Sequence, residues 1–138
     1  MDVTQNITIG TSHSKSVLVT REMTVAHFHD DMPEVYGTPM MIYLMEVTAT
    51  EAIQRFLPEG WGTVGAVVNV KHLAATPMGF TVTARAEVIA INDRLVTFAV
   101  EAHDGVEKIG EGTHVRAAIH LERFEKRVKE KGSGDRKD

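Results

Sequence analysis

Hydrophobic and polar positions follow a helical period in one segment of the chain and a two-residue period in most of the rest. Between Pro39 and Pro58 apolar side chains recur at the spacing of an α-helix, and Thr38 before Pro39 is a suitable N-cap. We therefore predict a helix over residues 39–57. Its first half is apolar on nearly every side, which is typical of a helix that other structure covers.

Alternation of apolar and polar residues predicts half-buried strands on both sides of this helix. The predicted strands are 15–25 before the helix and 61–75, 79–92, 94–103 and 106–121 after it. In the last of them the alternation places Ile109, Thr113, Val115 and Ala117 on one face and Gly110, His114 and Arg116 on the other. A short charged helix, 121–131, is expected to follow.

This order of elements predicts an α+β fold in which one curled antiparallel sheet of five strands surrounds a long central helix, the hot-dog arrangement. Such a sheet leaves free edges, so we expect a homodimer, with a dimer of dimers as the alternative. We expect one domain over residues 1–131 and a solvated, disordered tail over 132–138.

The composition excludes several kinds of site and partner. The 138 residues include no cysteine, which excludes disulfides, thiolate metal sites and a cysteine nucleophile. The formal charge of −4 argues against nucleic-acid binding. Neither a signal segment nor a membrane-spanning run is apparent, so we expect a cytoplasmic protein.

Two side chains stand out as candidates for catalysis. Glu46 lies in the middle of the apolar helix, where a buried carboxylate is costly and its pKa would be raised. The alternative is a carboxylate on an exposed stripe of the helix, or one paired with a basic residue. His72 shares a strand face with Val68 and Val70, which predicts an inward imidazole suited to general base catalysis. A hydrogen-bonded core histidine is the alternative.

Other polar positions have simpler explanations. Thr38 needs no role beyond the helix N-cap, although its hydroxyl could face a pocket. Gly65 allows either a β-bulge or close approach of a ligand to an oxyanion-stabilising N–H. The segment 27–31 (HFHDD) has metal-ligand residue types but no further ligand at a recognised spacing, so we predict a polar loop and no metal. His103, His114 and His120 are expected at the solvent or in a dimer contact.

Taken with Thr38, Glu46 and His72, four segments give the chain a specific resemblance. They are residues 33–46 (PEVYGTPMMIYLME), 65–72 (GAVVNVKH), 75–86 (ATPMGFTVTARA) and 102–121 (AHDGVEKIGEGTHVRAAIHL). The chain resembles the hot-dog thioesterases of the fluoroacetyl-CoA thioesterase type. This resemblance implies hydrolysis of an acyl-CoA thioester without a cofactor, a catalytic set of Thr38, Glu46 and His72, and an oxyanion-stabilising glycine at Gly65.

The resemblance also bears on substrate binding. Met32 stands where the fluoroacetyl-specific enzyme has a phenylalanine of its aromatic lid, which argues against fluoroacetyl specificity. Met32 and Met41 are candidates for an adaptable pocket that takes small or medium acyl groups, with core filling as the alternative. Arg116, Arg85 and Lys71 are candidates for contacts with CoA phosphates, with surface solvation as the alternative.

Three functions remain open at this point. They are an acyl-CoA thioesterase, a non-catalytic acyl-CoA-binding module and an enoyl-CoA hydratase or dehydratase. The acyl group, the choice between CoA and a carrier-protein thioester, and the choice between an anhydride and a general-base mechanism are also open.

Overall fold

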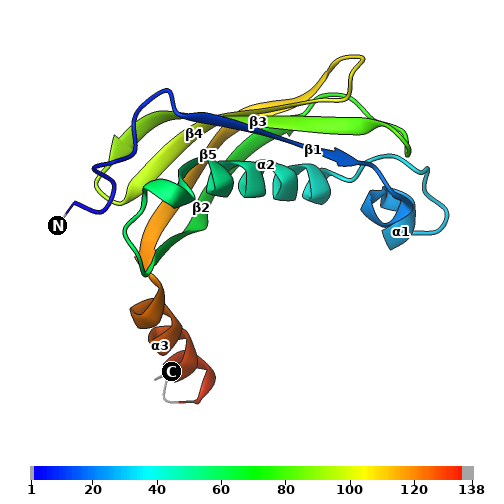
Figure 1. Cartoon of the computed structure of the whole chain (residues 1–138). Helices are drawn as coiled ribbons and strands as arrows, with labels where there is room; N and C mark the ends of the chain where they lie inside the picture. Colours follow the sequence, from blue (N-terminus) through cyan, green and yellow to red (C-terminus); the bar gives the residue numbers. More distant parts are fainter. Residues whose placement is uncertain (1, 135–138) are drawn as a thin grey trace.

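In the computed structural model of this chain, which describes residues 2–134, one antiparallel sheet curls over one long helix (Figure 1). The strands are β1 (Ser12–Leu18), β2 (Trp61–His72), β3 (Thr81–Asn92), β4 (Leu95–His103) and β5 (Lys108–His120), and the helices are α1 (Val25–Phe28), α2 (Thr38–Ile53) and α3 (Leu121–Gly132). The sheet order is β1-β3-β4-β5-β2, so β1 and β2 form its two edges. The predicted hot-dog arrangement of five strands and a long helix is confirmed.

Several boundaries differ from the predicted ones for local reasons. The first strand ends at Leu18, because a 3₁₀ turn, η1 (Arg21–Met23), interrupts the segment that we predicted to be extended. Helix α2 begins at Thr38 with Gly37 as its N-cap, so the prediction that Thr38 is the N-cap is wrong. The helix ends at Ile53 and a second 3₁₀ turn, η2 (Gln54–Phe56), completes the predicted span.

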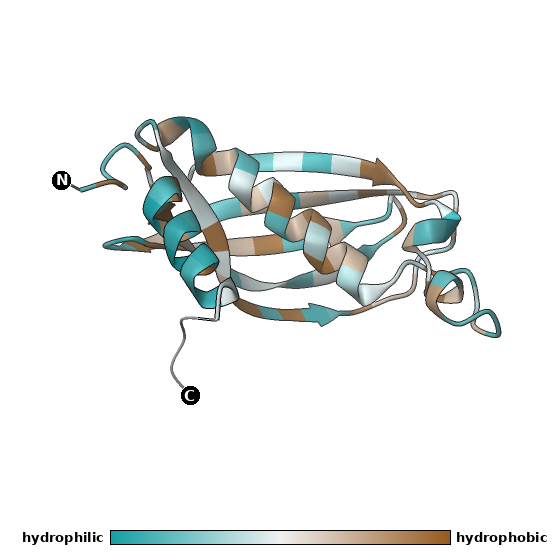
Figure 2. Ribbon diagram, turned by 90° about the horizontal axis from the view of Figure 1, so that it is seen from below, coloured by the Kyte–Doolittle hydropathy of each residue, from teal (hydrophilic) through white to brown (hydrophobic). Residues whose placement is uncertain are grey.

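Helix α2 packs one side against the concave face of the sheet. Its buried residues are Met41, Leu44, Met45, Thr48, Ala49, Ala52 and Ile53. They meet the fully buried inner faces of β3 and β4, where small side chains such as Ala84, Ala86 and Ala102 let the helix approach closely. The other side of α2 is open, as Figure 2 shows, and Tyr43 is 62% exposed. We predicted that other structure covers this helix on all sides. Within one chain the sheet covers only one side of it.

The inward face of β5 is opposite to the predicted one over much of its length. His114 and Arg116 are 1% and 7% exposed, whereas Val115 and Ala117 are only half-buried. The prediction that His114 lies at the solvent or in a dimer contact is therefore wrong. The inward row suits the helix, because it combines Gly110, where Met41 of α2 approaches closely, with two polar side chains that face Glu46.

The C-terminal part of the chain forms α3, which leaves the sheet on the side that carries α2 (Figure 1). The helix includes Gly132, the first residue of the predicted tail, and residues 135–138 of that tail lie outside the described residues. Among residues 2–134, no helix has the length and apolar character needed to cross a membrane.

Candidate active site

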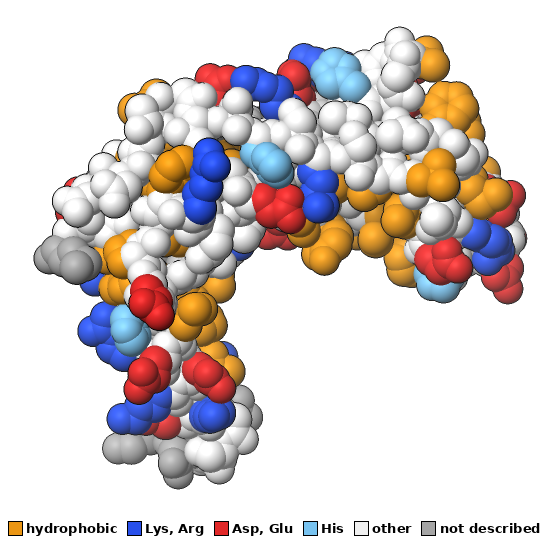
Figure 3. All heavy atoms as spheres, viewed as in Figure 1, with side chains coloured by type: hydrophobic (Ala, Val, Ile, Leu, Met, Phe, Trp, Pro, Cys, Tyr) orange, Lys and Arg blue, Asp and Glu red, His pale blue; other side chains and the backbone are white. Residues whose placement is uncertain are grey.

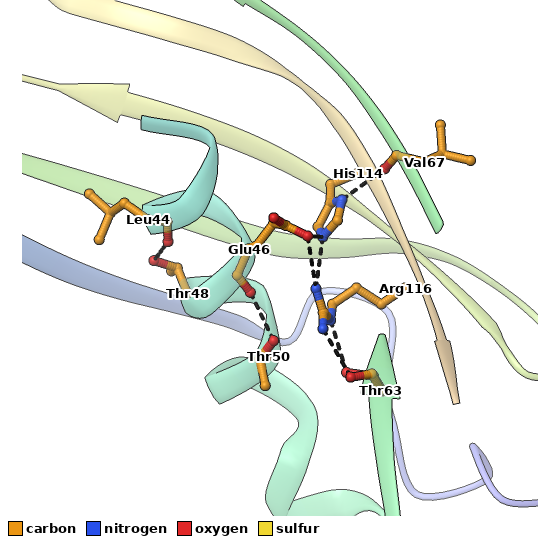
Figure 4. Close-up of polar contacts among 8 residues, drawn as sticks. All are labelled: Leu44, Glu46, Thr48, Thr50, Thr63, Val67, His114 and Arg116. Carbon is orange, nitrogen blue, oxygen red and sulfur yellow. Dashed lines mark hydrogen bonds and ion pairs between the residues drawn. The ribbon is translucent and has the colours of Figure 1, made fainter. Parts of the chain in front are cut away.

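Glu46 extends from the middle of α2 toward β5 and β2 (Figure 4). Its Oε2 lies 3.5 Å from Nη1 of Arg116 and 3.9 Å from Nε2 of His114. The carboxylate is half-buried, with 35% of its side chain exposed, and among residues 2–134 its second oxygen, Oε1, has no ion-pair partner. We expected a buried carboxylate without a partner. The structure instead has a half-buried carboxylate with one oxygen in an ion pair, which is the alternative of pairing with a basic residue.

Arg116 is held in place by β2 and β5 together. Its Nε donates to Oγ1 of Thr63 at 2.8 Å, its Nη2 donates to the Thr63 carbonyl at 3.0 Å, and its Nη1 donates to Nε2 of His114 at 3.1 Å. Burial lowers the pKa of Arg116 and the carboxylate of Glu46 opposes that shift. An arginine keeps its charge at neutral pH even so, so it can form the ion pair with Glu46.

His114 is the neutral member of this group. Burial lowers its pKa, the charge of Arg116 acts in the same direction, and the Val67 carbonyl and Glu46 oppose them. Its Nδ1–H donates to the Val67 carbonyl at 2.8 Å, which leaves Nε2 as the acceptor for Arg116. The imidazole therefore orients Arg116 and ties β5 to the irregular part of β2.

That irregularity brings Gly65 under the Glu46 carboxylate. The register between β2 and β5 shifts between Gly65 and Val67, as at a β-bulge. A Cβ added at Gly65 would overlap Oε2 of Glu46. The glycine is therefore needed for the close approach of the carboxylate to the strand backbone, whether or not its N–H also meets a ligand.

Thr38 and His72 form a second polar pair near the N-terminus of α2. Their Oγ1 and Nδ1 atoms lie 2.6 Å apart beside a cleft of about 400 Å³, whose lining also includes Val25, Val35 and Leu73. Burial lowers the pKa of His72, with the backbone of Ala74 acting in the opposite direction, so the imidazole is neutral at pH 7. Its Nε2 is buried and has no hydrogen-bond partner among the described residues.

The predicted catalytic set is thus brought together only in part. Thr38 and His72 are in contact, but Glu46 lies eight residues further along α2, a rise of roughly 12 Å along the helix axis. Within one chain the site consists of a Thr38–His72 half and a Glu46–Arg116 half. His114 is the residue that sequence reasoning missed; its alternation with Arg116, two residues on, was the available signal.

The remaining predicted site residues have varied surroundings. Met32 is 45% exposed in the loop after α1, and Met41 is fully buried, with its Sδ 2.5 Å from where a Cβ at Gly110 would lie. Because Arg116 is buried against Glu46, the surface solvation offered as its alternative role is wrong. Residues 27–31 lie in α1 and the loop after it, and nowhere among residues 2–134 do three or more His, Asp or Glu side chains gather in a way that could hold a metal ion.

Comparisons with known proteins agree with the hot-dog fold. The model of the fluoroacetyl-CoA-specific thioesterase family matches residues 19–122. The fluoroacetyl-CoA thioesterase of Streptantibioticus cattleyicolor is 40% identical over 129 residues, covering 89% of this chain and 93% of that protein. A solved structure of the fluoroacetyl-CoA thioesterase is 39% identical, with a TM-score of 0.86 over 91% of this chain and 97% of that one. A hot-dog-like protein from Thermanaerovibrio acidaminovorans is 26% identical, with a TM-score of 0.86 over 95% and 97%.

Proposed function

Because this chain belongs to the fluoroacetyl-CoA-specific thioesterase family, we propose that it hydrolyses a small or medium acyl-CoA thioester to the free acid and CoA. Water is the only other reactant, so the proposal needs no cofactor. The observation that carries it is the Thr38–His72 hydrogen bond of 2.6 Å beside the cleft at the start of α2. A neutral imidazole held by a hydroxyl, with its second nitrogen buried and unpaired, is equipped to exchange a proton with a reacting group.

The proposal includes a homodimer in which two copies of β2 pair with each other. Among residues 2–134, β2 pairs only with β5, and residues 65–69 at its centre are exposed. An unprotected edge of this kind is a template for strand addition. Antiparallel pairing about a two-fold axis through Asn69 would set Val67 opposite Lys71 of a second copy. The extra residue of the bulge between Gly65 and Val67 would then set Gly65 opposite His72 of that copy. Both residues face the helix side, as directly opposed residues must.

This pairing would complete the catalytic set. Glu46 lies over Gly65 of its own chain, so it would arrive beside His72 of the other chain. The unpaired Nε2 of His72 and the free Oε1 of Glu46 would then share one cleft with Thr38. Each dimer would contain two such sites, because the interface is symmetric.

In this site Glu46 either removes a proton from the attacking water or attacks the thioester carbonyl itself. The first route forms a tetrahedral oxyanion that the Gly65 N–H stabilises, and its collapse breaks the C–S bond. The second forms an anhydride, which water then opens. In the first route the proton that Glu46 takes from water passes to His72, which gives it to the leaving thiolate of CoA. In the second route CoA leaves as the thiolate and takes up a proton released when water opens the anhydride. In both routes Thr38 orients the imidazole.

The acyl group is proposed to be small or medium because of the residues around the cleft. Val25, Val35 and Leu73 give it an apolar lining, and the exposed Met32 lies in the adjoining loop. Methionine adapts its shape to different acyl chains. We therefore expect activity on several short acyl-CoA esters instead of strict selection of the fluoroacetyl group.

Thiol release from a panel of purified acyl-CoA esters, from acetyl to octanoyl and including fluoroacetyl, tests the reaction. We expect turnover of one or more short members, and none in Glu46→Ala with an unchanged circular dichroism spectrum. Absence of turnover across the panel, in a wild-type protein that binds CoA, would favour the non-catalytic binding module. Enoyl-CoA hydration is followed in parallel, and hydration without thiol release would overturn hydrolysis.

Mixing inactive chains tests whether two copies form the site. Glu46→Ala and His72→Ala chains are each expected to be inactive. After joint unfolding and refolding, a mixed dimer has one site with both native residues, so the mixture should recover about a quarter of wild-type activity. No recovery, with mixed dimers demonstrated by two different affinity tags, would show that Glu46 and His72 do not act across the interface.

A further inference from the structure

A basic cleft lies where α3 leaves the sheet, apart from the residues of the proposed catalytic set. It has a volume of about 530 Å³, and its charged or polar lining is Arg94, His120, Arg123, Lys126, Arg127 and Glu130. Four permanent cations therefore face one carboxylate, on a chain whose formal charge is −4. In Figure 3, Lys and Arg side chains with a histidine gather near the junction of the α3 arm and the body.

The cations of this cleft are not neutralised by ion pairs within the described part of the chain. Among the described residues 2–134, none of Arg94, Arg123, Lys126 and Arg127 takes part in a salt bridge. By contrast, Lys129 on the same helix pairs with Glu125 at 3.2 Å. Unpaired cations that line a concave surface attract an anionic ligand more strongly than the same charges on a convex one, because the cleft focuses their field.

Two of the guanidinium groups are held in place by Trp61, the first residue of β2. The guanidinium carbon of Arg94 lies 4.9 Å from the centre of the indole, and that of Arg123 lies 5.7 Å from it. Cation–π contacts of this length restrain long side chains that would otherwise sample many rotamers. Trp61 is 9% exposed and so provides a rigid support.

The helix that carries the other cations is also fixed at its start. The His120 side chain caps α3 by accepting from the Arg123 N–H at 3.3 Å, and the Leu121 N–H donates to the Gly60 carbonyl at 2.9 Å. The cleft is therefore built by the end of β5, the β3–β4 turn and one face of α3. It is a structured feature, not a chance grouping of surface lysines.

We infer that this cleft binds the phosphate groups at the nucleotide end of CoA. Guanidinium groups match phosphate oxygens in a bidentate geometry, and the volume lies within the range of small-molecule sites, roughly 300–1,000 Å³. Along β5, His120 at the cleft is four residues from Arg116 beside Glu46, which is roughly 13 Å in a strand. The pantetheine arm of CoA is an extended chain that joins its phosphates to the thioester across such a separation.

This inference rests on the proposed function and sharpens it, because it selects CoA over a carrier-protein thioester as the substrate. A carrier protein presents phosphopantetheine without the nucleotide, and its acidic surface would approach the exterior of α3. The concave shape of the cleft favours the smaller ligand.

The test compares two double variants that remove the same charge from the same helix. Arg123→Gln/Arg127→Gln removes two guanidinium groups from the lining of the cleft. Lys129→Gln/Lys131→Gln is the matched control, because neither lysine lines the cleft. Calorimetry with CoA, dephospho-CoA and pantetheine gives the binding constants. The KM is measured for the best acyl-CoA of the wild-type panel and for the same acyl group on pantetheine.

We expect Arg123→Gln/Arg127→Gln to raise the Kd for CoA and the KM for the acyl-CoA by about tenfold or more, with kcat and pantetheine binding unchanged. The control pair should change either constant by less than about twofold. Trp61→Leu, which removes the support of Arg94 and Arg123, should weaken CoA binding in the same direction; Arg94→Gln provides the same readout if that variant does not fold.

Equal effects of the two double variants on the Kd for CoA would overturn the inference. They would show that general surface charge, and not the cleft, attracts CoA. A change confined to an acyl carrier protein substrate would also overturn it. Hydrolysis of acyl-pantetheine by wild type and variants, with no effect of any variant on CoA, would refute the phosphate site while leaving the proposed hydrolase function intact. If no thioester is hydrolysed, the hydrolase function fails, and the binding constants still decide the phosphate site.

Discussion

Replacing Gly65 with alanine should lower turnover by displacing the Glu46 carboxylate while leaving the fold intact. The added Cβ would overlap Oε2 of Glu46, and it would also lie 3.4 Å from Cε1 of His114 and 3.6 Å from Nη1 of Arg116. The last two contacts are tolerable, so the methyl group fits only if the carboxylate retreats, by on the order of 1 Å. Misplacement of a reacting group by this amount costs about 100-fold in rate, or about 2.7 kcal/mol in activation free energy.

The assay is steady-state thiol release, with thermal melting as the check on the fold. We expect kcat to fall about 100-fold with KM nearly unchanged. Gly62→Ala is the matched control on the same strand, because its Cβ would meet only the Leu121 side chain, with Cδ2 at 3.1 Å, and a flexible leucine can move aside. Wild-type kcat in Gly65→Ala, with a normal melting temperature, would refute the reasoning that the position of this carboxylate controls the reaction.

Glu46→Gln keeps the shape of the side chain and removes its basicity, so kcat should fall by about two to four orders of magnitude; a fall below tenfold would contradict the assigned role. Thr38→Ala should reduce kcat through misorientation of His72, and Thr38→Ser, which restores the hydroxyl, should recover most of it; equal rates in the two variants would rule out the hydrogen bond. Because burial lowers the pKa of His72 from its ordinary 6.5, the imidazole is neutral above that pH. The rate constant kcat/KM should therefore be flat from pH 7 upward and fall only below pH 6.5, and an acid limb centred above pH 7 would contradict this. Burial also lowers the pKa of His114, so the unfolded chain binds the proton more readily. Stability should consequently decline as the pH falls through 6.5, with a smaller decline in His114→Gln measured by thermal melting.

Much of the fold could be predicted from the sequence because its signals are local. The switch from a helical period to a two-residue period marks α2 and the four strands that follow it. The inward position of His72 also follows from alternation, since Val70 on the same face packs against the core. Glu46 could be singled out because a lone carboxylate in an apolar helix is conspicuous, whatever its partners.

The surroundings of Glu46 could not be predicted, because they depend on which face of β5 points inward. Hydrophobicity favoured the face with Val115 and Ala117, yet His114 and Arg116 face the helix. The inward row of β5 contains a glycine, an imidazole and a guanidinium group, so its composition alone predicts an exposed face. Tertiary contacts bury it instead. Its burial becomes favourable only once Glu46 is in place as an ion-pair partner and the Thr63 carbonyl as a hydrogen-bond acceptor, and neither is adjacent to β5 in sequence.

Pairing of β2 with a second copy would account for four features of the single chain. Within residues 2–134, helix α2 has an open side with Tyr43 exposed, β2 has a free edge, His72 has a buried nitrogen without a partner, and Glu46 has one carboxylate oxygen without an ion-pair partner. Each is costly or unexplained on its own, since folded proteins avoid both exposed strand edges and buried polar atoms that lack a hydrogen-bond partner. Pairing of β2 with a second copy would cover the edge, bring a second α2 alongside the first and place a carboxylate beside the unpaired imidazole. In the proposed dimer the separation of Glu46 from Thr38 along one helix would be a requirement of the site, because each chain would supply one half to each of two symmetric pockets.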